Sequence, residues 1–172
     1  ARRQALAQLQ QKVQQQGDLG KWLEANGLTQ ARPLWASLSV EAGWSSAVEA
    51  VLRERLAALT AIDDATARRV LDTPPPATLA MAWPGGASDD VVSFEGLTPL
   101  STHVQCTADW SVTIACWLTG VFAVEDLAAW LPRRESIPAG VMLINPKGQA
   151  LTRDALVHHV GDARTHGVIE RA

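Results

Sequence analysis

The first 16 residues form a polar, glutamine-rich segment with a single narrow apolar stripe. Leu6, Leu9 and Val13 recur at intervals of three and four residues, which places them on one side of a helix. A stripe this narrow is typical of a coiled coil and too narrow for a helix buried in a globular core. Gly17 and Asp18 are predicted to end this helix, and a second short helix is predicted to follow.

The clearest amphipathic helix begins after Gly43. Ser46 and Glu49 have the spacing of a capping box, in which each side chain accepts a hydrogen bond from the other residue's backbone N–H. Apolar residues then recur at helical spacing on one face. That face, which we expect to be largely buried, consists of Trp44, Ala47, Val48, Val51, Leu52 and Leu56.

Short strands and helices alternate along the rest of the chain. Asp63 or Asp64 is predicted to cap a helix that ends near Leu71, before a run of prolines. The predicted strands cover residues 34–40, 59–62, 78–83, 120–124, 140–145, 149–151 and 156–160, and further helices begin near residues 109, 125 and 168. This order predicts a mixed α/β or α+β fold with two related halves, separated near residues 96–105.

The composition is that of a globular protein. Of the 172 residues, 47% are hydrophobic and 19% are charged, which suits one domain or two small subdomains that share a core. The net charge of −3 argues against a dedicated nucleic-acid-binding domain, which would be strongly basic. No apolar run is long enough to cross a bilayer and no signal peptide opens the chain, so a soluble protein is expected. The first residue is not Met and both ends lie in predicted helices, so we expect a piece of a longer polypeptide.

The residue types that carry catalysis or bind metals do not form a recognisable site. Residues 43–47 miss the Gly-x-Ser-x-Gly nucleophile elbow at the fifth position, and their serines are explained by the start of a helix. His158 and His159 would point to opposite faces of a strand, so they would not bind one metal ion together. No metal site is therefore predicted.

Cys106 and Cys116 are too few for a disulfide framework and lack zinc-site spacing, so we expect them to be reduced and buried. The Gly-x-x-x-x-Gly-Lys-Ser/Thr phosphate loop does not occur, and no cofactor is expected in this chain. A small cytosolic α/β enzyme with an unrecognised centre remains the alternative. A polar pocket lined by titratable groups with shifted pKa values would favour it.

Three segments, in their order and spacing, resemble the hinge domain of bacterial SMC (structural maintenance of chromosomes) proteins. Residues 43–56 have a glycine and an aromatic residue followed by Ala-Val-Glu-x-x-Leu. Residues 118–127 have Leu-x-Gly-x-x-x-Val followed by two acidic residues and Leu, and residues 141–151 have a strand, an Asn-Pro-Lys-Gly turn and a second strand. The chain departs from the family at residues 77–84 and 158–161, where the family builds part of its dimer interface.

The resemblance implies a dimerisation module rather than an enzyme. It divides the chain into a coiled-coil arm stub (1–17), hinge subdomain I (18–100), hinge subdomain II (101–165) and the start of the returning arm (166–172). Residues 1–16 and the segment after Thr165 are expected to lie side by side as antiparallel helices. The implied parent is a cytoplasmic, nucleoid-associated protein of chromosome condensation and segregation, whose ATP- and Mg²⁺-binding heads and kleisin-binding regions lie outside this chain.

Two predicted strands offer edges for homodimerisation, because an unpaired strand edge readily recruits another strand. In a two-fold dimer the first-half edge of one copy would pair with the second-half edge of the other, twice. The candidate interface residues are Thr78, Leu79, Ala80 and Met81 in the first half and Ala155, Leu156, Val157, His158 and His159 in the second.

Basic residues are the candidates for contact with DNA, which the resemblance makes a possible partner. The candidates are Arg133, Arg134, Lys147 and Arg153. An ordinary solvated surface explains the same residues, since such charges cover most soluble domains. Any contact with phosphates would be weak, non-specific and salt-dependent, with a preference for single strands or ends.

Overall fold

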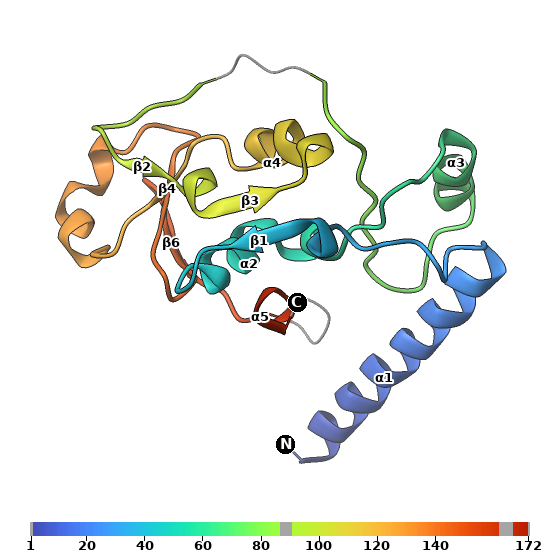
Figure 1. The fold of residues 1–172 in the computed structure, drawn as a ribbon. Coiled ribbons are helices and arrows are strands. Elements are labelled where there is room, and N and C mark those ends of the chain that lie inside the picture. The colour runs from blue at the N-terminus through green and yellow to red at the C-terminus, as the bar shows by residue number, and fades with distance from the viewer. Residues whose placement is uncertain (1, 87–90, 162–166, 172) are drawn as a thin grey trace.

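The computed structural model describes residues 2–86, 91–161 and 167–171. A five-stranded sheet, a two-stranded ribbon and short helices form the body, and the long helix α1 projects from it (Figure 1). The helices are α1 (Arg2–Ala25), α2 (Ser45–Leu52), α3 (Asp64–Asp72), α4 (Ser111–Trp117) and α5 (Val168–Arg171). The strands are β1 (Leu38–Val40), β2 (Thr98–Pro99), β3 (Val104–Cys106), β4 (Val121–Ala123), β5 (Met142–Ile144), β6 (Gln149–Leu151) and β7 (Leu156–His158). The 3-10 helices are η1 (Leu34–Ser37), η2 (Arg53–Ala57), η3 (Leu100–His103), η4 (Ala108–Trp110) and η5 (Ala128–Ser136). The predicted mixed α/β class is confirmed.

The larger sheet has the strand order β2-β4-β5-β6-β7. β4 and β5 run parallel, with Phe122 opposite Leu143, and the other neighbouring strands are antiparallel. These two side chains lie on one face of the sheet and are fully buried, and Ile144 on the other face is fully buried too, as expected for a parallel pair covered on both faces. β2 and β7 are the two edges of the sheet.

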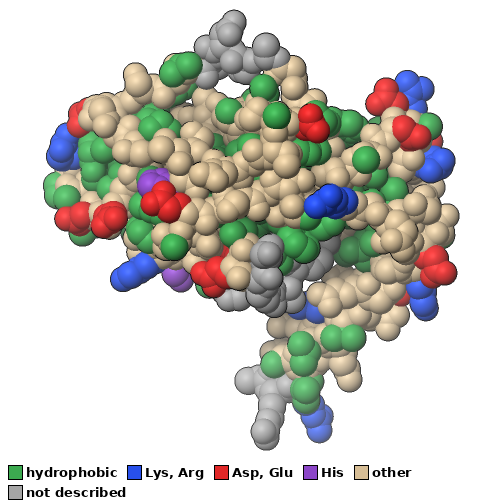
Figure 2. Space-filling model, viewed as in Figure 1, with side chains coloured by type: hydrophobic (Ala, Val, Ile, Leu, Met, Phe, Trp, Pro, Cys, Tyr) green, Lys and Arg blue, Asp and Glu red, His purple; other side chains and the backbone are tan. Residues whose placement is uncertain are grey.

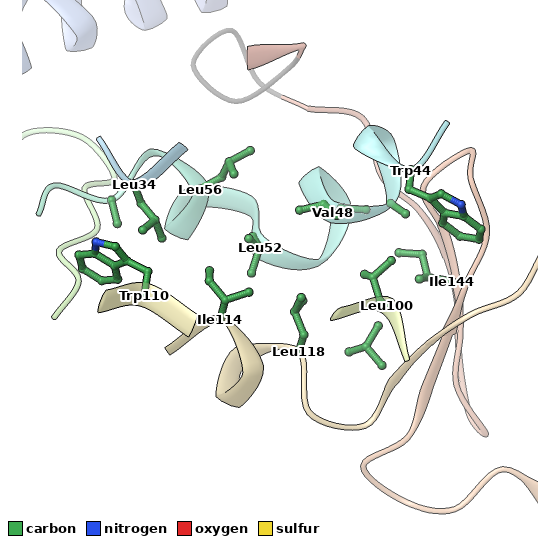
Figure 3. Close-up of a cluster of buried hydrophobic side chains, with 14 of the residues drawn as sticks. Leu34, Trp44, Val48, Leu52, Leu56, Leu100, Trp110, Ile114, Leu118 and Ile144 are labelled. Carbon is green, nitrogen blue, oxygen red and sulfur yellow. The ribbon is translucent and has the colours of Figure 1, made fainter. Parts of the chain in front are cut away.

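The main hydrophobic cluster contains residues from both halves of the sequence. β1 pairs with β3, with Val40 opposite Val104. Side chains of α2 point toward α4 (Figure 3). Val48 and Leu52 of α2 face Ile114 of α4 and Leu118, which directly follows that helix. Within the described residues the two halves therefore share this cluster, and the subdomain boundary at residue 100 stays a prediction.

Helix α1 continues through residues 17 and 18, so the predicted end at that point is wrong. A glycine inside a helix costs roughly 1 kcal/mol relative to alanine, and neighbouring contacts offset that cost. Asp18 accepts a hydrogen bond from Gln14 one turn earlier, at 3.1 Å, and Leu19 is buried against the body. Gly27, with φ +68°, follows the end of the helix.

The remainder of α1 is largely polar on its surface. Its apolar stripe is open to solvent, with Leu6, Leu9 and Val13 exposed by 56%, 59% and 63%. In the part of the chain that the structure describes, no helix is both long and apolar enough to span a membrane.

Helix α2 is the predicted amphipathic helix, but it lacks the predicted capping box. It begins at Ser45, so its N-cap residue is Trp44 rather than Ser46. Glu49 does not reach back to the start of the helix and instead bonds a distant backbone group, described below. The predicted apolar face is buried except for the half-buried Val51, its buried members being Trp44, Ala47, Val48, Leu52 and Leu56.

Two predicted strands, residues 59–62 and 78–83, are not formed. Leu59 makes two isolated bridges, antiparallel with Pro33 and parallel with Met81. Its N–H bonds the carbonyl of Ala80 at 2.9 Å, and its carbonyl accepts from the N–H of Ala82 at 3.0 Å. Pro33 stands opposite Leu59, and Pro76 and Pro84 border residues 78–83; proline donates no N–H, which keeps these ladders short.

The predicted strands of the second half are confirmed as β4, β5, β6 and β7, and the helix near residue 109 is confirmed as η4 and α4. Asp63 is the residue that caps α3, since its side chain accepts from the N–H of Thr66 at 2.7 Å. Two other predictions need correction. Residues 34–37 form η1 ahead of β1, and the helix predicted from residue 125 is the later 3-10 helix η5, whose Pro132 does not suit an α-helix.

Helix α5 begins at Val168, as predicted. Val168 and Ile169 pack against the main hydrophobic cluster, and α5 contacts β1. In the described residues α5 lies on the body rather than along α1 (Figure 1), so the predicted side-by-side helices are not seen there. Residues 162–166 of the predicted returning segment lie outside the described residues.

Candidate functional site

Strand β7 is an exposed edge of the larger sheet. Within the residues that the structure describes, no strand pairs with its outer side, and all three of its residues are exposed. Leu156 is 59% exposed and Val157 is 42% exposed, although both are apolar. An exposed apolar edge strand is a surface on which another chain can add a strand.

The ladder between β6 and β7 determines which backbone groups of β7 point outward. Thr152 donates to the carbonyl of Ala155 at 2.8 Å, and His159 donates to the carbonyl of Gly148 at 3.3 Å. Hydrogen-bonded pairs alternate along an antiparallel ladder, so Val157 also faces β6. The N–H and C=O groups of Leu156 and His158 therefore point away from β6, toward the open edge.

The opposite edge of this sheet, β2, is poorly suited to pairing with another strand. β2 has two residues, and Pro99 stands opposite Phe122 of β4. A proline has no N–H to offer to an added strand. Of the two edges of the larger sheet, β7 is therefore the one suited to strand addition.

The first-half candidate segment is extended but forms a single bridge. Ala80 and Ala82 direct their bonding groups toward Leu59, so the N–H and C=O of Met81, between them, point to the opposite side. Thr78 is exposed, whereas Leu79 packs against a small cluster formed by Leu28, Leu59 and Ile62.

A cleft of about 890 Å³ brings parts of the two candidate edges together. Thr78 lines it from the first half and His159 lines it from the second. The rest of its lining comes from α1, from η2 and from the segments next to these two residues, and consists of Lys12, Gln15, Gln16, Leu19, Arg53, Glu54, Pro75, Pro76, Ala77, Val160 and Gly161. The two candidate segments thus open into a common space within one chain.

The four candidate DNA contacts do not form one patch. Arg133 bonds Glu95 at 2.7 Å and lies over the ring of Trp130 at 4.4 Å, while Arg134 donates to a carbonyl of its own helix. Lys147 precedes β6 and Arg153 follows it, so these two exposed side chains lie at opposite ends of that strand. Lys and Arg side chains are scattered among Asp and Glu on the face in Figure 2.

The role of Glu49 was not predicted from the sequence. This residue is 4% exposed, and its Oε1 accepts a hydrogen bond from the backbone N–H of Gly167 at 2.8 Å. The sequence does contain a pattern that could have predicted a buried position for Glu49, because small and apolar residues surround it on nearly every side of α2. Such a helix is buried all round, and a buried acidic side chain on it needs an internal partner.

The remaining reactive side chains do not converge on a pocket. Cys106 is half-buried and burial raises the pKa of its thiol, whereas Cys116 is exposed on α4, so the prediction of two buried cysteines is wrong for Cys116. Hydrogen bonds from Thr66 lower the pKa of the Asp63 carboxyl, which caps a helix. Neither Asp63 nor Cys106 lines the large cleft, and the described residues contain no cluster of His, Cys, Asp and Glu that would hold a metal ion.

Comparisons with known proteins agree with this architecture. Residues 30–129 match the family model described as SMC proteins Flexible Hinge Domain. The chain is 45% identical over 209 residues to the chromosome partition protein Smc of Thauera aminoaromatica and 37% identical over 173 residues to that of Burkholderia pseudomallei. These alignments cover 99% and 100% of this chain but only 17% and 15% of the two relatives.

Solved structures of low sequence identity share the fold. A crystal structure of an asymmetric dimer of the Geobacillus stearothermophilus SMC hinge domain has a TM-score of 0.59 and 16% identity, covering 99% of this chain and 77% of that chain. The Pyrococcus furiosus SMC hinge domain has a TM-score of 0.58 and 14% identity, covering 91% and 88%. The segment matched by the family model is more than half of the chain and includes both α2 and α4, and the chain therefore belongs to the family of SMC hinge domains.

Proposed function

We propose that this chain is the homodimerisation hinge of a chromosome partition protein and joins its two coiled-coil arms. The observation that carries the proposal is the open edge of β7, where apolar side chains and outward backbone groups are exposed together. Relatives described as chromosome partition proteins and the dimeric hinge of Geobacillus stearothermophilus support it. The chain acts mechanically in this proposal, without catalysis or a cofactor of its own.

The open stripe on α1 supports the arm assignment. Leu6, Leu9 and Val13 face solvent at coiled-coil spacing, and a returning helix of the longer protein would cover them. ATP and Mg²⁺ binding, contact with a kleisin and association with the nucleoid would belong to that longer protein.

The proposed dimer pairs β7 of one copy with the segment around Met81 of the other. Leu156 and His158 offer outward N–H and C=O groups, and Met81 offers its own pair on the first-half segment. A two-fold axis makes the same pairing twice and leaves neither segment open.

Sedimentation velocity at micromolar concentration tests the interface. His158→Pro removes an outward N–H and should weaken the dimer at least about fivefold, since one lost hydrogen bond and a disturbed edge cost more than roughly 1 kcal/mol. His158→Ala is the matched control, because it keeps the N–H and should remain dimeric. Val157→Pro is unsuitable, since that N–H faces β6 within the same chain. A folded, fully dimeric His158→Pro variant would place the interface elsewhere.

Contact with DNA is a secondary part of the proposal. Lys147 and Arg153 are exposed and lie at opposite ends of β6, whereas the charge of Arg133 is paired with Glu95. A net charge of −3 and scattered basic residues favour weak, non-specific contact with phosphates.

A further inference from the structure

Glu49 is a buried carboxylate that accepts a hydrogen bond from a residue far away in the sequence. It stands in the middle of α2 and accepts from Gly167, 118 residues later, at 2.8 Å. A buried carboxylate is costly unless hydrogen bonds replace its water. The position of this side chain therefore depends on the peptide group that it holds.

Gly167 is the residue that leads into α5. It has φ +68° and directly precedes α5. Val168 and Ile169 then pack on the main hydrophobic cluster. Among the contacts that hold this departing helix are the hydrogen bond from Gly167 to Glu49 and the half-buried side chains of Val168 and Ile169.

The same helix, α2, also supports the hairpin that carries β7. Gly148, in the turn between β5 and β6, approaches α2 so closely that a Cβ there would lie 3.0 Å from the carbonyl oxygen of Ser46. His159, just beyond β7, donates to the carbonyl of Gly148. Helix α2 therefore contacts the edge hairpin at one place and the departing helix at another.

We propose that Glu49 is a positioning residue that fixes the direction of the departing helix α5 relative to the β7 edge, by tying Gly167 to α2. The hinge then has a rigid path from its candidate dimer edge to one of its arms. The other arm, α1, is attached elsewhere, since Trp22 and Leu23 pack against the cluster of Leu28, Leu59 and Ile62. The two arms are therefore held by different clusters, and Glu49 controls only the departing one.

The reach of the side chain makes the proposal specific. Glu49→Gln keeps an oxygen acceptor at the same distance, whereas Glu49→Asp keeps the charge but is shorter by one methylene. Glu49→Ala removes the acceptor altogether. The hydrogen bond to Gly167 should be kept in the Gln variant and lost in the Asp and Ala variants.

Amide hydrogen exchange, measured by NMR on the whole chain, directly reports whether the hydrogen bond between Gly167 and Glu49 is formed. In Glu49→Ala and Glu49→Asp, exchange at Gly167 and Val168 should rise about tenfold or more, the loss expected for a hydrogen bond to a charged acceptor. Exchange at Leu143, in the centre of the sheet, serves as the reference for global stability and should change much less. Glu54→Ala, an exposed acidic residue of η2, is the matched control and should leave all these rates unchanged.

Pulsed dipolar spectroscopy reads the direction of the helix. Spin labels on Gln10→Cys and Glu170→Cys, in a chain with Cys106→Ala and Cys116→Ser and diluted with unlabelled chain, report the distance between the two arms. The distribution should broaden or shift in Glu49→Ala and return in Glu49→Gln. A Gln variant that behaves like Ala would overturn the proposal, as would unchanged distances or a rise in exchange at Leu143 equal to that at Gly167.

Different measurements test the dimer and the role of Glu49, so one can be contradicted without the other. Sedimentation of the same variants reports the dimer, and Glu49→Ala is expected to remain dimeric while its arm is released. Loss of the dimer in His158→Pro with an intact tie at Gly167 would show that the two features are independent.

Discussion

Leu52 lies where α2 faces α4, and its side chain is fully buried in the main cluster (Figure 3). Asp63 and Glu49 differ from it because their roles depend on a single acceptor oxygen. Asp63 bonds a residue three positions away, whereas Glu49 bonds one that is 118 positions away. Single residues in this protein therefore stabilise the fold in three ways: by burial, by capping a nearby helix, or by a hydrogen bond to a residue distant in the sequence.

Leu52→Ala should lower the free energy of unfolding by about 2–4 kcal/mol, because it removes a buried side chain and leaves a cavity. Val51→Ala on the same helix is the control and should cost only about 1 kcal/mol, since Val51 is half-buried. Urea unfolding followed by circular dichroism measures both. Equal losses would mean that the helix faces the core differently.

Among the elements, the parallel pair of β4 and β5 depends on two glycine turns. Gly120 precedes β4 and Gly140 precedes β5, with φ +76° and +82°. A Cβ on Gly120 would lie 2.6 Å from the carbonyl oxygen of Gly140, whereas a Cβ on Gly140 would meet nothing within 4 Å. The two positions share a backbone conformation and differ in the space around them.

Gly140→Ala should therefore cost about 1–2 kcal/mol for the left-handed conformation alone. Gly120→Ala adds a clash with backbone and should cost about 1–3 kcal/mol more. Thermal unfolding of the two variants at one pH compares them directly. A Gly120→Ala variant as stable as Gly140→Ala would show that the two turns are not in close contact.

At the scale of the whole molecule, one chain presents a projecting helix (Figure 1), scattered basic residues (Figure 2) and the open edge of β7. Lys147→Glu and Arg153→Glu should each weaken binding to single-stranded DNA and lower the salt slope of log K by about 1, if each makes one phosphate contact. Arg133→Glu should change the slope less, because Glu95 already neutralises Arg133. Fluorescence anisotropy across a salt series measures these slopes, and unchanged slopes in both Lys147→Glu and Arg153→Glu would remove those residues as contacts.

Much of the second half was predictable from its sequence. The hairpin of β5 and β6 follows from a strand, an Asn-Pro-Lys-Gly turn and a second strand, and Asn145 accepts the N–H groups of Lys147 and Gln149 within that turn. The first half was less predictable. Residues 59–62 and 78–83 have strand-like composition, but they form only the isolated bridges of Leu59 with Pro33 and with Met81, which come from distant parts of the sequence.

Sequence patterns were enough to predict the elements whose contacts lie within a few residues, namely the apolar face of α2, the cap of α3 and the β5–β6 hairpin, and the motifs were enough to predict membership of the hinge family. The folded structure was needed to show that α1 continues to Ala25, that β1 pairs with β3, which N–H groups of β7 face outward and that Glu49 accepts from Gly167. The difference lies in how far apart along the sequence the contacting residues are. Periodicity and turn chemistry depend on neighbouring residues, whereas a buried carboxylate or an open strand edge takes its partner from whatever segment the folded chain brings beside it.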